Sequence, residues 1–438
     1  MRKKLEIYKI DYPLVFVVIL VVFIGILMIY SAGFDPIDKV NSGLFKKQML
    51  WFIVGFALML AMTLINYKFL GDYSLHIYSF FLLLLILTLV IGKPIRNTKA
   101  WLSFGFLSLQ PSEFMKLSLV IVLAKYLEIR EREITNIREL VIPAVLTLIP
   151  MLIILAQPDF GTAILFIPIL FTLLFVGGAD VSHLVATISI AVIALVLPMV
   201  LTYREWIGAE SADAVLSIFK DFRLLFIISG VLMVIAVATF ILHLIFLKKT
   251  YRKIYIPSLV ISMGLFFSVI IQRFLKDYQK KRILVFLNPD LDPHGSGYNV
   301  IQSKIAIGSG GFFGKGFLNG SQSQLGFLPE KTSDFIFSVV AEEWGFFGAI
   351  VVLGLLGYIV YKGIQTAFEA KDKFGALLAS GISCIFFFHI LINIGMVLGI
   401  MPVTGIPLCL VSYGGSNLMM CLLSIGILIN IRMRKFVY

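Results

Sequence analysis

Long stretches without a charged residue are the feature that most limits how this chain can fold. One of them, LVFVVILVVFIGILMIY, covers residues 14–30 and follows the basic stretch MRKKLEIYK. A helix needs roughly 20 apolar residues to cross a hydrocarbon core about 30 Å thick, and it satisfies its own backbone amides there. Because 59% of the residues are hydrophobic and 14% are charged, we expect an all-α polytopic membrane protein whose first apolar run is a retained anchor.

The apolar runs predict about twelve transmembrane helices, with end errors of a few residues. We place them near residues 14–31, 48–65, 75–92, 112–127, 141–156, 161–177, 184–202, 224–247, 254–272, 335–361, 375–399 and 407–431. The net charge of +12 comes largely from basic clusters between these runs, and the positive-inside rule explains it without nucleic acid. With these clusters in the cytoplasm, both termini are cytoplasmic, and segments 32–47, 93–111, 203–223 and 273–334 lie outside. We expect one membrane domain over residues 1–438.

The longest outer segment, residues 273–334, is polar and rich in glycine. Its passage NPDLDPHGSGYNVIQSKIAIGSGGFFGKG interleaves glycines with apolar residues, and glycine lets a backbone turn tightly and approach a ligand closely. We therefore predict an ordered loop in which YNVIQSKIAI forms a short amphipathic helix on the membrane surface. GSGGFFGKG lacks the spacing of a P-loop. The basic residues of the loop form either a solvated rim or a surface that gathers an anionic substrate.

Ionisable residues recur at the expected outer ends of the helices. Asp290 and Asp292 lie in NPDLDP, where they serve either in a turn or in catalysis. Glu113 and Lys116, three residues apart in QPSEFMK, fit a structural salt bridge on one helix face, although charges inside a bilayer also mark functional cavities. The same alternatives apply to Asp159 in QPDFGTA and to Asp334, Glu342 and Glu343 in KTSDFIFSVVAEEWG.

Other polar side chains predict packing rather than chemistry. His389 and Asn393, four residues apart in a late span, are expected to form interhelical hydrogen bonds. Cys384, Cys409 and Cys421 lie in apolar runs without metal or disulfide spacing, so we expect buried thiols. The five histidines are dispersed, and we predict no metal site from them.

Five motifs, in order, resemble those of the SEDS family (shape, elongation, division, sporulation). They are QPSEFMK, AQPDFGTA, the passage from NPDLDP to GFFGKG, SQSQLGFLPEKTSDFIFSVVAEEWGFFG and MPVTGIPLCLVSYGGSN. They extend over nearly the whole chain, and the SQSQL…FLPE stretch is more similar to the elongation branch than to the division branch. The resemblance implies a peptidoglycan glycosyltransferase that polymerises lipid II on the outer face of the cytoplasmic membrane during cell elongation, usually beside a class B penicillin-binding protein.

The resemblance also implies roles for single residues. The family's essential aspartate before the G-x-G-Y turn corresponds to Asp292, its QPSE glutamate and lysine to Glu113 and Lys116, and its QPD aspartate to Asp159. Two departures are visible. Residues 203–253 look like an inserted segment with one extra span, which adds a helix pair to the family's ten-helix core. Thr332 and Ser333 stand where the family has His-Thr before DFIF, which removes the histidine at that point.

Polymerisation of lipid II requires a groove for a prenyl tail, cations for a pyrophosphate and a polar site for sugars. A single inverting displacement needs a base near the attacking 4-hydroxyl and positive charge near the leaving group. We assign Asp292 as the base or as the group that orients the hydroxyl, and Lys116, Lys304 and Lys315, with Arg96 and Lys99 as weaker candidates, to the pyrophosphate. The full substrate-binding set expected is Glu113, Lys116, Asp159, Gln302, Lys304, Lys315, Glu330 and Asp334.

Three alternatives stay open. A lipid II flippase would need polar groups along a route through both leaflets, whereas the unusual charges here gather toward the outer end. A division-type polymerase of the same family would share the motifs. A noncatalytic partner of a penicillin-binding protein leaves the acidic, glycine-rich loop without a purpose. No cofactor is firmly predicted; a divalent cation that bridges a carboxylate and the pyrophosphate fits the chemistry, and the sequence does not establish it.

Overall fold

The structure is a computed structural model that describes residues 10–35, 40–95, 98–104, 107–131, 137–207, 222–274 and 296–435. Arg96, Asp290 and Asp292, which the sequence singles out, lie outside these ranges. The chain divides into two compact units. The first consists of Met1–Ala179 with Asn299–Tyr438, and the second of Asp180–Tyr298.

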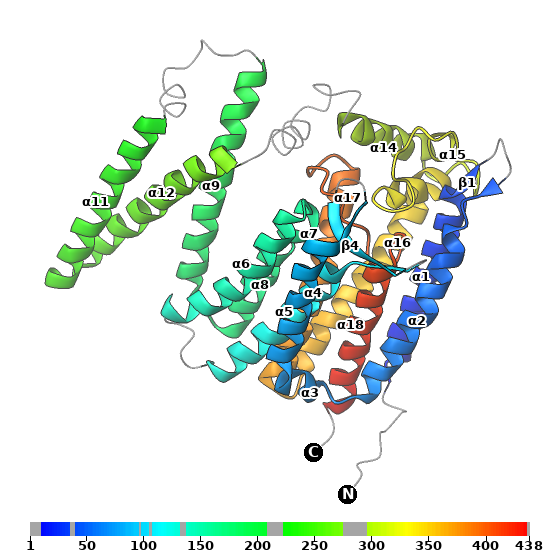
Figure 1. The fold of residues 1–438 in the computed structure, drawn as a ribbon, viewed down its shortest axis with the longest axis horizontal. Helices are drawn as coiled ribbons and strands as arrows, with labels where there is room; N and C mark the ends of the chain where they lie inside the picture. Colours follow the sequence, from blue (N-terminus) through cyan, green and yellow to red (C-terminus); the bar gives the residue numbers. More distant parts are fainter. Residues whose placement is uncertain are drawn as a thin grey trace, which may run out of the picture. The chain divides into compact units, whose positions relative to one another are not determined.

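The first unit is a bundle of long helices (Figure 1). Its described helices are α1 (Tyr12–Ala32), α2 (Leu44–Leu64), α3 (Tyr67–Asp72), α4 (Ser74–Ile91), α5 (Pro111–Ile129), η2 (Ile137–Leu140), α6 (Val141–Ala156), α7 (Phe160–Ile164), α8 (Phe166–Gly177), α14 (Ser296–Gly310, which begins just before the unit), α15 (Ser321–Gln324), α16 (Ile336–Glu369), α17 (Lys373–Val397) and α18 (Gly415–Arg434). Two small antiparallel sheets lie in segments predicted as outer loops. They are β1 (Phe34–Asp35) with β2 (Val40–Asn41), and β3 (Lys93–Ile95), β4 (Thr98–Phe104) and β5 (Leu107–Leu109).

The described residues contain 11 spans that are long and apolar enough to cross a membrane. The prediction of an all-α polytopic membrane protein is therefore confirmed. α5 is a further helix of 19 residues, about 28 Å long at 1.5 Å per residue, and it matches the predicted span 112–127. Charged side chains are costly in lipid, and every residue of α5 from Pro111 to Ala124 is buried. Because α4, α6, α8, α17 and α18 pack around it, the charged residues Glu113 and Lys116 lie inside the bundle.

The last span differs from its predicted bounds. The sequence predicts a helix over residues 407–431, whereas α18 covers Gly415–Arg434. The segment between α17 and α18 is apolar but irregular, because Pro402 does not let α17 continue and Leu410, with φ 65°, lies outside the right-handed helical region. Ser412 fixes this segment: its Oγ accepts a hydrogen bond from Leu408 N over 2.8 Å and donates to Ser333 O over 2.6 Å.

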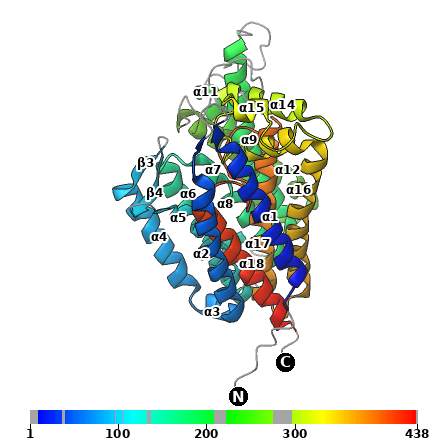
Figure 2. The same cartoon turned by 90° about the vertical axis from the view of Figure 1, so that its right-hand side faces the viewer.

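The start of α1 and the end of α18 lie at one end of the first unit. Asp11 caps α1 by accepting from Leu14 N, and its Oδ2 forms ion pairs with Lys362 of α16 at 3.2 Å and Arg432 of α18 at 2.9 Å. α14, α15 and β1 lie at the opposite end (Figures 1 and 2). An even number of spans returns the chain to the side on which it began, so the predicted even number agrees with this arrangement.

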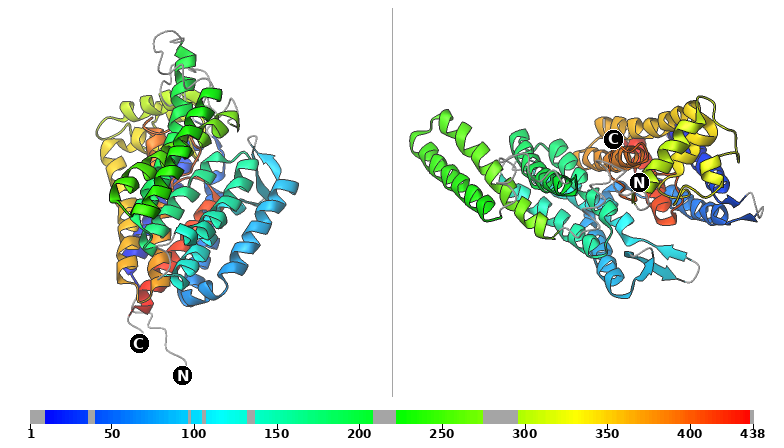
Figure 3. Two further views of the ribbon diagram at one scale, coloured as in Figure 1. Left: turned by 90° about the vertical axis from the view of Figure 1, so that its left-hand side faces the viewer. Right: turned by 90° about the horizontal axis from the view of Figure 1, so that it is seen from above.

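The second unit contains α9 (Val181–Ile207), α11 (Phe222–Phe246) and α12 (Lys249–Phe274), drawn in green in Figure 3. Leu225, Leu265 and Val269 form its buried core. Ser229 and Ser262 tie α11 to α12 by donating to each other's carbonyl oxygens, at 3.0 and 2.8 Å. The predicted insertion, residues 203–253, includes α11, and its identity as an insertion stays a prediction.

Candidate active site

A buried ion pair near the N-terminus of α5 is the centre of the candidate site. Pro111 fits the first turn of α5, where no amide donor is needed, and Glu113 follows in that turn, where the helix dipole favours a carboxylate. Lys116 Nζ donates to Glu113 Oε2 over 2.9 Å, with 0% of the lysine side chain and 3% of the glutamate side chain exposed. The salt bridge that the i, i+3 spacing indicated is present, and it is an internal one.

Side chains from two other helices, α17 and α18, form hydrogen bonds with this ion pair. His389 Nδ1 lies 3.1 Å from the carbonyl oxygen of Pro407, and because a carbonyl only accepts, we assign the ring proton to Nδ1. Nε2 then accepts from Lys116 Nζ at 2.7 Å. Asn417 Nδ2 donates to Glu113 Oε2 over 2.9 Å. The interhelical hydrogen bond predicted for His389 is confirmed, and this buried cluster joins α5, α17 and α18.

Asp159 lies beside the buried cluster, where the chain passes from α6 to α7. It caps α7, since Oδ1 accepts from Thr162 N over 3.1 Å and Oδ2 from Thr162 Oγ1 over 2.8 Å. Gln110 Nε2 donates to Oδ2 over 2.9 Å. Burial raises the pKa of Asp159 above its ordinary value, while the hydrogen bonds from Thr162 act against burial and the charge of Glu113 acts with it. This carboxyl therefore holds a proton more tightly than an ordinary aspartate does.

The helix α16 is interrupted at Gly345, and the loop after α14 occupies the break. Gly345 has φ 67°, which side chains other than glycine rarely adopt. The backbone of residues 311–316 pairs with α16 there, through Phe346 N to Gly311 O at 2.9 Å, Phe347 N to Phe312 O at 3.1 Å, Lys315 N to Glu342 O at 3.0 Å and Gly316 N to Glu343 O at 3.0 Å. A Cβ on Gly314 would lie 2.1 Å from Glu343 O. The ordered loop that the glycine spacing predicts is confirmed over its described part, residues 296–334.

Glu342 ties the next part of the loop to α16. Its buried carboxylate accepts hydrogen bonds from Gln322 N at 2.8 Å and Ser323 N at 3.0 Å. Lys315 Nζ forms an ion pair with Glu342 Oε1 at 3.2 Å and donates to Ser321 Oγ at 2.6 Å. The Lys315 side chain is 28% exposed, so its ammonium is directed to the protein by Glu342.

Glu343 joins the same loop to α1. Its Oε1 accepts a hydrogen bond from Ser31 Oγ, and Gln324 Nε2 donates to Ser31 O over 3.0 Å. Lys331 Nζ donates to Ser323 O over 2.5 Å. Burial lowers the pKa of Lys331, and the charges of Asp35 and Glu343 oppose that effect. Residues 315–331 are thus held to α1 and α16 by buried polar contacts.

Asn393 connects this loop to the neighbourhood of the buried cluster. It lies one turn beyond His389 on α17, and its Nδ2 donates to Ile406 O over 2.7 Å and to Asp334 O over 2.9 Å. Tyr413 N also donates to Thr332 O over 2.9 Å. The residues that lead the loop into α16 therefore rest on the segment between α17 and α18.

The other residues expected to bind substrate are spread over the loop. Gln302 is half-buried and Lys304 is exposed on α14, and no hydrogen bond among the described residues joins either to the buried cluster. Glu330 has φ 51°, and its Oε2 accepts from Ser333 Oγ over 3.4 Å. Asp334 is half-buried beside Gly405. Within the described ranges, no three His, Cys, Asp or Glu side chains are grouped to hold a metal ion.

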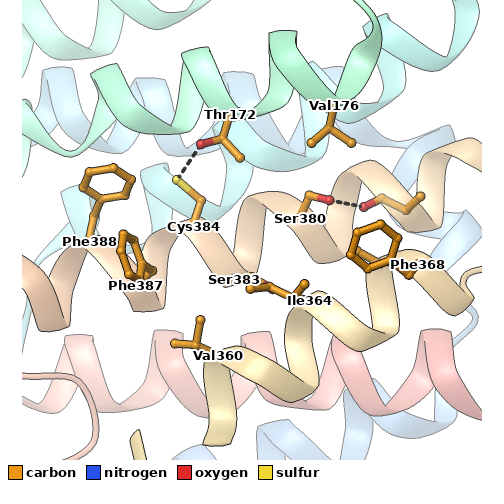
Figure 4. A pocket seen from close by; sticks show the side chains of 12 residues that line it. Thr172, Val176, Val360, Ile364, Phe368, Ser380, Ser383, Cys384, Phe387 and Phe388 are labelled. Carbon is orange, nitrogen blue, oxygen red and sulfur yellow. Dashed lines mark hydrogen bonds between the residues drawn. The ribbon is translucent and has the colours of Figure 1, made fainter. Parts of the chain in front are cut away.

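An apolar pocket of about 400 Å³ lies between α8, α16 and α17 (Figure 4). Its lining includes Phe368, Phe387 and Phe388, and Thr172 Oγ1 donates to Cys384 Sγ over 3.2 Å at its edge. None of the residues expected to bind substrate lines it. Its chemistry suits hydrocarbon rather than sugar or phosphate.

The chain matches the family of FtsW, RodA and SpoVE, described as "Cell cycle protein", over residues 12–221 and 215–436. It is 37% identical over 432 residues to the Treponema pallidum protein named "Peptidoglycan glycosyltransferase RodA", covering 97% of this chain and 98% of that protein. It is 32% identical to "Stage V sporulation protein E" of Bacillus subtilis, covering 96% of each chain. The fold is similar to a chain in a structure of "a peptidoglycan synthase complex", with TM-score 0.70, 29% identity and coverage of 98% and 99%. The chain belongs to this family, the SEDS proteins.

Proposed function

We propose that this chain is a peptidoglycan glycosyltransferase that polymerises lipid II into β-1,4 glycan strands on the outer face of the cytoplasmic membrane. The observation that carries the proposal is its full-length similarity to a protein named as such a transferase. The polar loop built into the break of α16 supports the proposal, because a lipid-linked sugar has to be bound where the membrane ends. The single membrane domain over residues 1–438, with residues 273–334 as its catalytic loop, is part of the proposal.

In the proposed reaction, Asp292 takes the proton of the attacking sugar hydroxyl or orients that hydroxyl. Positive charge then stabilises the leaving pyrophosphate. Lys116 and Lys315 are paired with Glu113 and Glu342 in the free protein, so the charge of each ammonium group is already partly compensated. The exposed Lys304 of α14 forms no ion pair with any other residue in the described ranges. We assign Lys304 the first pyrophosphate contact, and Asp159, Gln302, Glu330 and Asp334 stay proposed substrate contacts.

Reconstitution of the full chain in proteoliposomes with labelled lipid II tests this function. We expect glycan ladders from the wild type, with and without a class B penicillin-binding protein, and none from Asp292→Asn. Asp290→Asn is the matched control, since it removes a neighbouring aspartate of the same motif and should retain ladders. Undiminished ladders from Asp292→Asn would remove this residue from the mechanism. Movement of lipid II across the bilayer without any polymer would make the chain a flippase.

We assign the chain to the elongation branch, with RodA, and propose a class B penicillin-binding protein as its partner. The SQSQL…FLPE stretch and the similarity to the Treponema protein support the branch, and the likeness to a chain of a synthase complex supports the partner. Depletion from the native cell should turn rods into round cells. Filaments that fail to divide would instead assign the chain to the division branch, with FtsW.

We also propose that both termini are cytoplasmic. Support comes from the basic residues Lys362, Arg432 and Lys435 at the end of the bundle where α1 begins, because such residues favour the cytoplasmic side. The three native cysteines are buried, so introduced ones can be labelled selectively. An impermeant maleimide should label Asp292→Cys in intact cells and Tyr438→Cys only after permeabilisation. The reverse pattern would invert the topology and remove residue 292 from the outer face.

A further inference from the structure

One face of α16 is an exposed apolar stripe. Phe346, Ile350, Tyr361, Ile364 and Phe368 are all exposed on it. The rise from Phe346 to Phe368 is about 33 Å at 1.5 Å per residue, which matches a hydrocarbon core about 30 Å thick. Polar groups stand at both ends of the stripe. Glu369 pairs with Lys435 next to Phe368, and the Glu342 carboxylate lies beyond the break at Gly345. A hydrocarbon core that covers the whole stripe would end at Phe346 and Phe347.

Phe312 and Phe313 of the loop lie at the level of this boundary. The backbone pairing brings Phe312 O to Phe347 N at 3.1 Å. The ring of Phe312 lies 5.8 Å from the ring of Phe346 and 4.9 Å from the ring of Phe313, measured between centroids. Phe312 is 57% exposed and Phe313 80% exposed. Two large apolar rings thus extend the stripe of a membrane-spanning helix, although they belong to the loop between α14 and α15.

We propose that Phe312 and Phe313 insert among the lipid acyl chains at this boundary and anchor the loop to the membrane. Acyl chains are the occupant because the rings continue, at the same depth, a surface whose length fits the hydrocarbon core, and removal of exposed aromatic surface from water is favourable. The loop is then held on two sides. Lys315 is bound inward by Glu342 at 3.2 Å, and the two phenylalanines are held outward by lipid. The proposal does not depend on the transferase activity.

Depth-dependent quenching on the full chain in proteoliposomes tests the anchor. A polarity-sensitive fluorophore is attached to Phe313→Cys, since the native cysteines are buried. Ile350→Cys, within the stripe, is the lipid control, and Asn319→Cys, exposed in the same loop, is the water control. The quenchers are phospholipids brominated on their acyl chains and aqueous iodide. We expect the label at residue 313 to follow the Ile350→Cys label, with strong quenching by bromolipid and little by iodide.

Two results would overturn the proposal. Iodide quenching equal to that of the Asn319→Cys label would show that the rings face water. Protection from both quenchers would show that protein, such as a second copy of the chain, covers the patch. Because Phe313 is 80% exposed, its substitution removes little native packing. A labelled Phe312→Cys variant gives a second reading at the ring that contacts Phe346, and it should show the same order of quenching.

Discussion

Replacement of Lys116 tests whether the pair in α5 behaves as a buried ion pair. In Lys116→Met the carboxyl group of Glu113, whose side chain is 3% exposed, keeps the hydrogen bond from Asn417 but loses its cation. At 2.9 Å and an effective dielectric constant of about 20, the attraction between the two charges is about 6 kcal/mol. Desolvation offsets most of this attraction in the intact pair. Removal of one partner leaves the other charge buried, which typically costs about 3–5 kcal/mol.

The same helix contains a matched control. Lys125 and Glu128 have the same residue types and spacing, with Nζ and Oε2 2.8 Å apart, but their side chains are 31% and 30% exposed. Pairs in contact with solvent contribute about 0–1 kcal/mol. Lys125→Met should therefore lower the free energy of unfolding far less than Lys116→Met does, although each variant breaks one i, i+3 pair of α5.

A double-mutant cycle measures the difference. The free energy of unfolding is measured in detergent for the wild type, Lys116→Met, Glu113→Gln and the double variant, and again for the pair Lys125 and Glu128. We expect the double variant at positions 113 and 116 to regain part of the stability lost in Lys116→Met, because no unpaired charge then stays buried. If Lys116→Met is as stable as Lys125→Met, the Glu113 charge is solvated in the working protein, and the reasoning from burial is refuted.

The structure also supplies a control variant for one further substitution and the direction of the pH effect for another. Gly345→Ala should cost roughly 1–3 kcal/mol, because φ is 67° and the new Cβ would lie 2.3 Å from Gly314 N. Gly354→Ala on the same helix meets open space, and it should not lower the thermal midpoint, because alanine is favoured over glycine inside a helix. Equal midpoints for the two variants would contradict the strain. Asp372 lies between α16 and α17 and is partly buried, which raises its pKa. Hydrogen bonds from Gly375 N and Tyr67 Oη and the ion pair with Lys68 outweigh burial, so the pKa of Asp372 is lowered from its ordinary value. Its contribution to stability is therefore present above the ordinary aspartate pKa and is lost as the pH falls through the lowered value. In Asp372→Asn, the free energy of unfolding should fall less steeply over this acid range than it does in the wild type. The same steepness in both proteins would exclude this carboxylate as the source of the pH dependence.

The sequence predicts the helices well because a spanning helix has a local signature. An apolar run has to be about as long as the bilayer is thick, and the predicted span 112–127 agrees with α5 despite its charges at 113 and 116. The predicted start of α18, residue 407, lies too early in the chain. Hydropathy treats MPVTGIPLCLVSYGG as apolar, whereas Gly405 and Leu410 have φ angles of 75° and 65°, which a right-handed helix does not contain. Composition thus locates a segment in the membrane without fixing its backbone conformation.

The contacts of the candidate site also include one that the sequence predicts and others that it does not. Glu113 and Lys116 are three residues apart, so helical periodicity predicts their contact. His389 and Asn417 are 273 and 304 positions away from their partners, and only the packing of α17 and α18 against α5 brings them together. Sequence reasoning assigned an interhelical bond to His389 but no partner, and it missed Asn417 and Gln110. Their places inside the SYGGSN and QPSE motifs were the available signal.

The segment between α17 and α18 accounts for the connection between the two polar regions. Its Pro407 carbonyl accepts from His389, which holds Lys116, and its Ser412 hydroxyl donates to Ser333 O just before α16. Thr404 O lies so close to Gly161 that a Cβ there would be 2.2 Å away, which brings the Asp159 turn against the same segment. An irregular segment can make these contacts because its carbonyl groups are not used within a helix. The irregular backbone that delays the start of α18 to Gly415 therefore makes backbone acceptors available to the buried cluster.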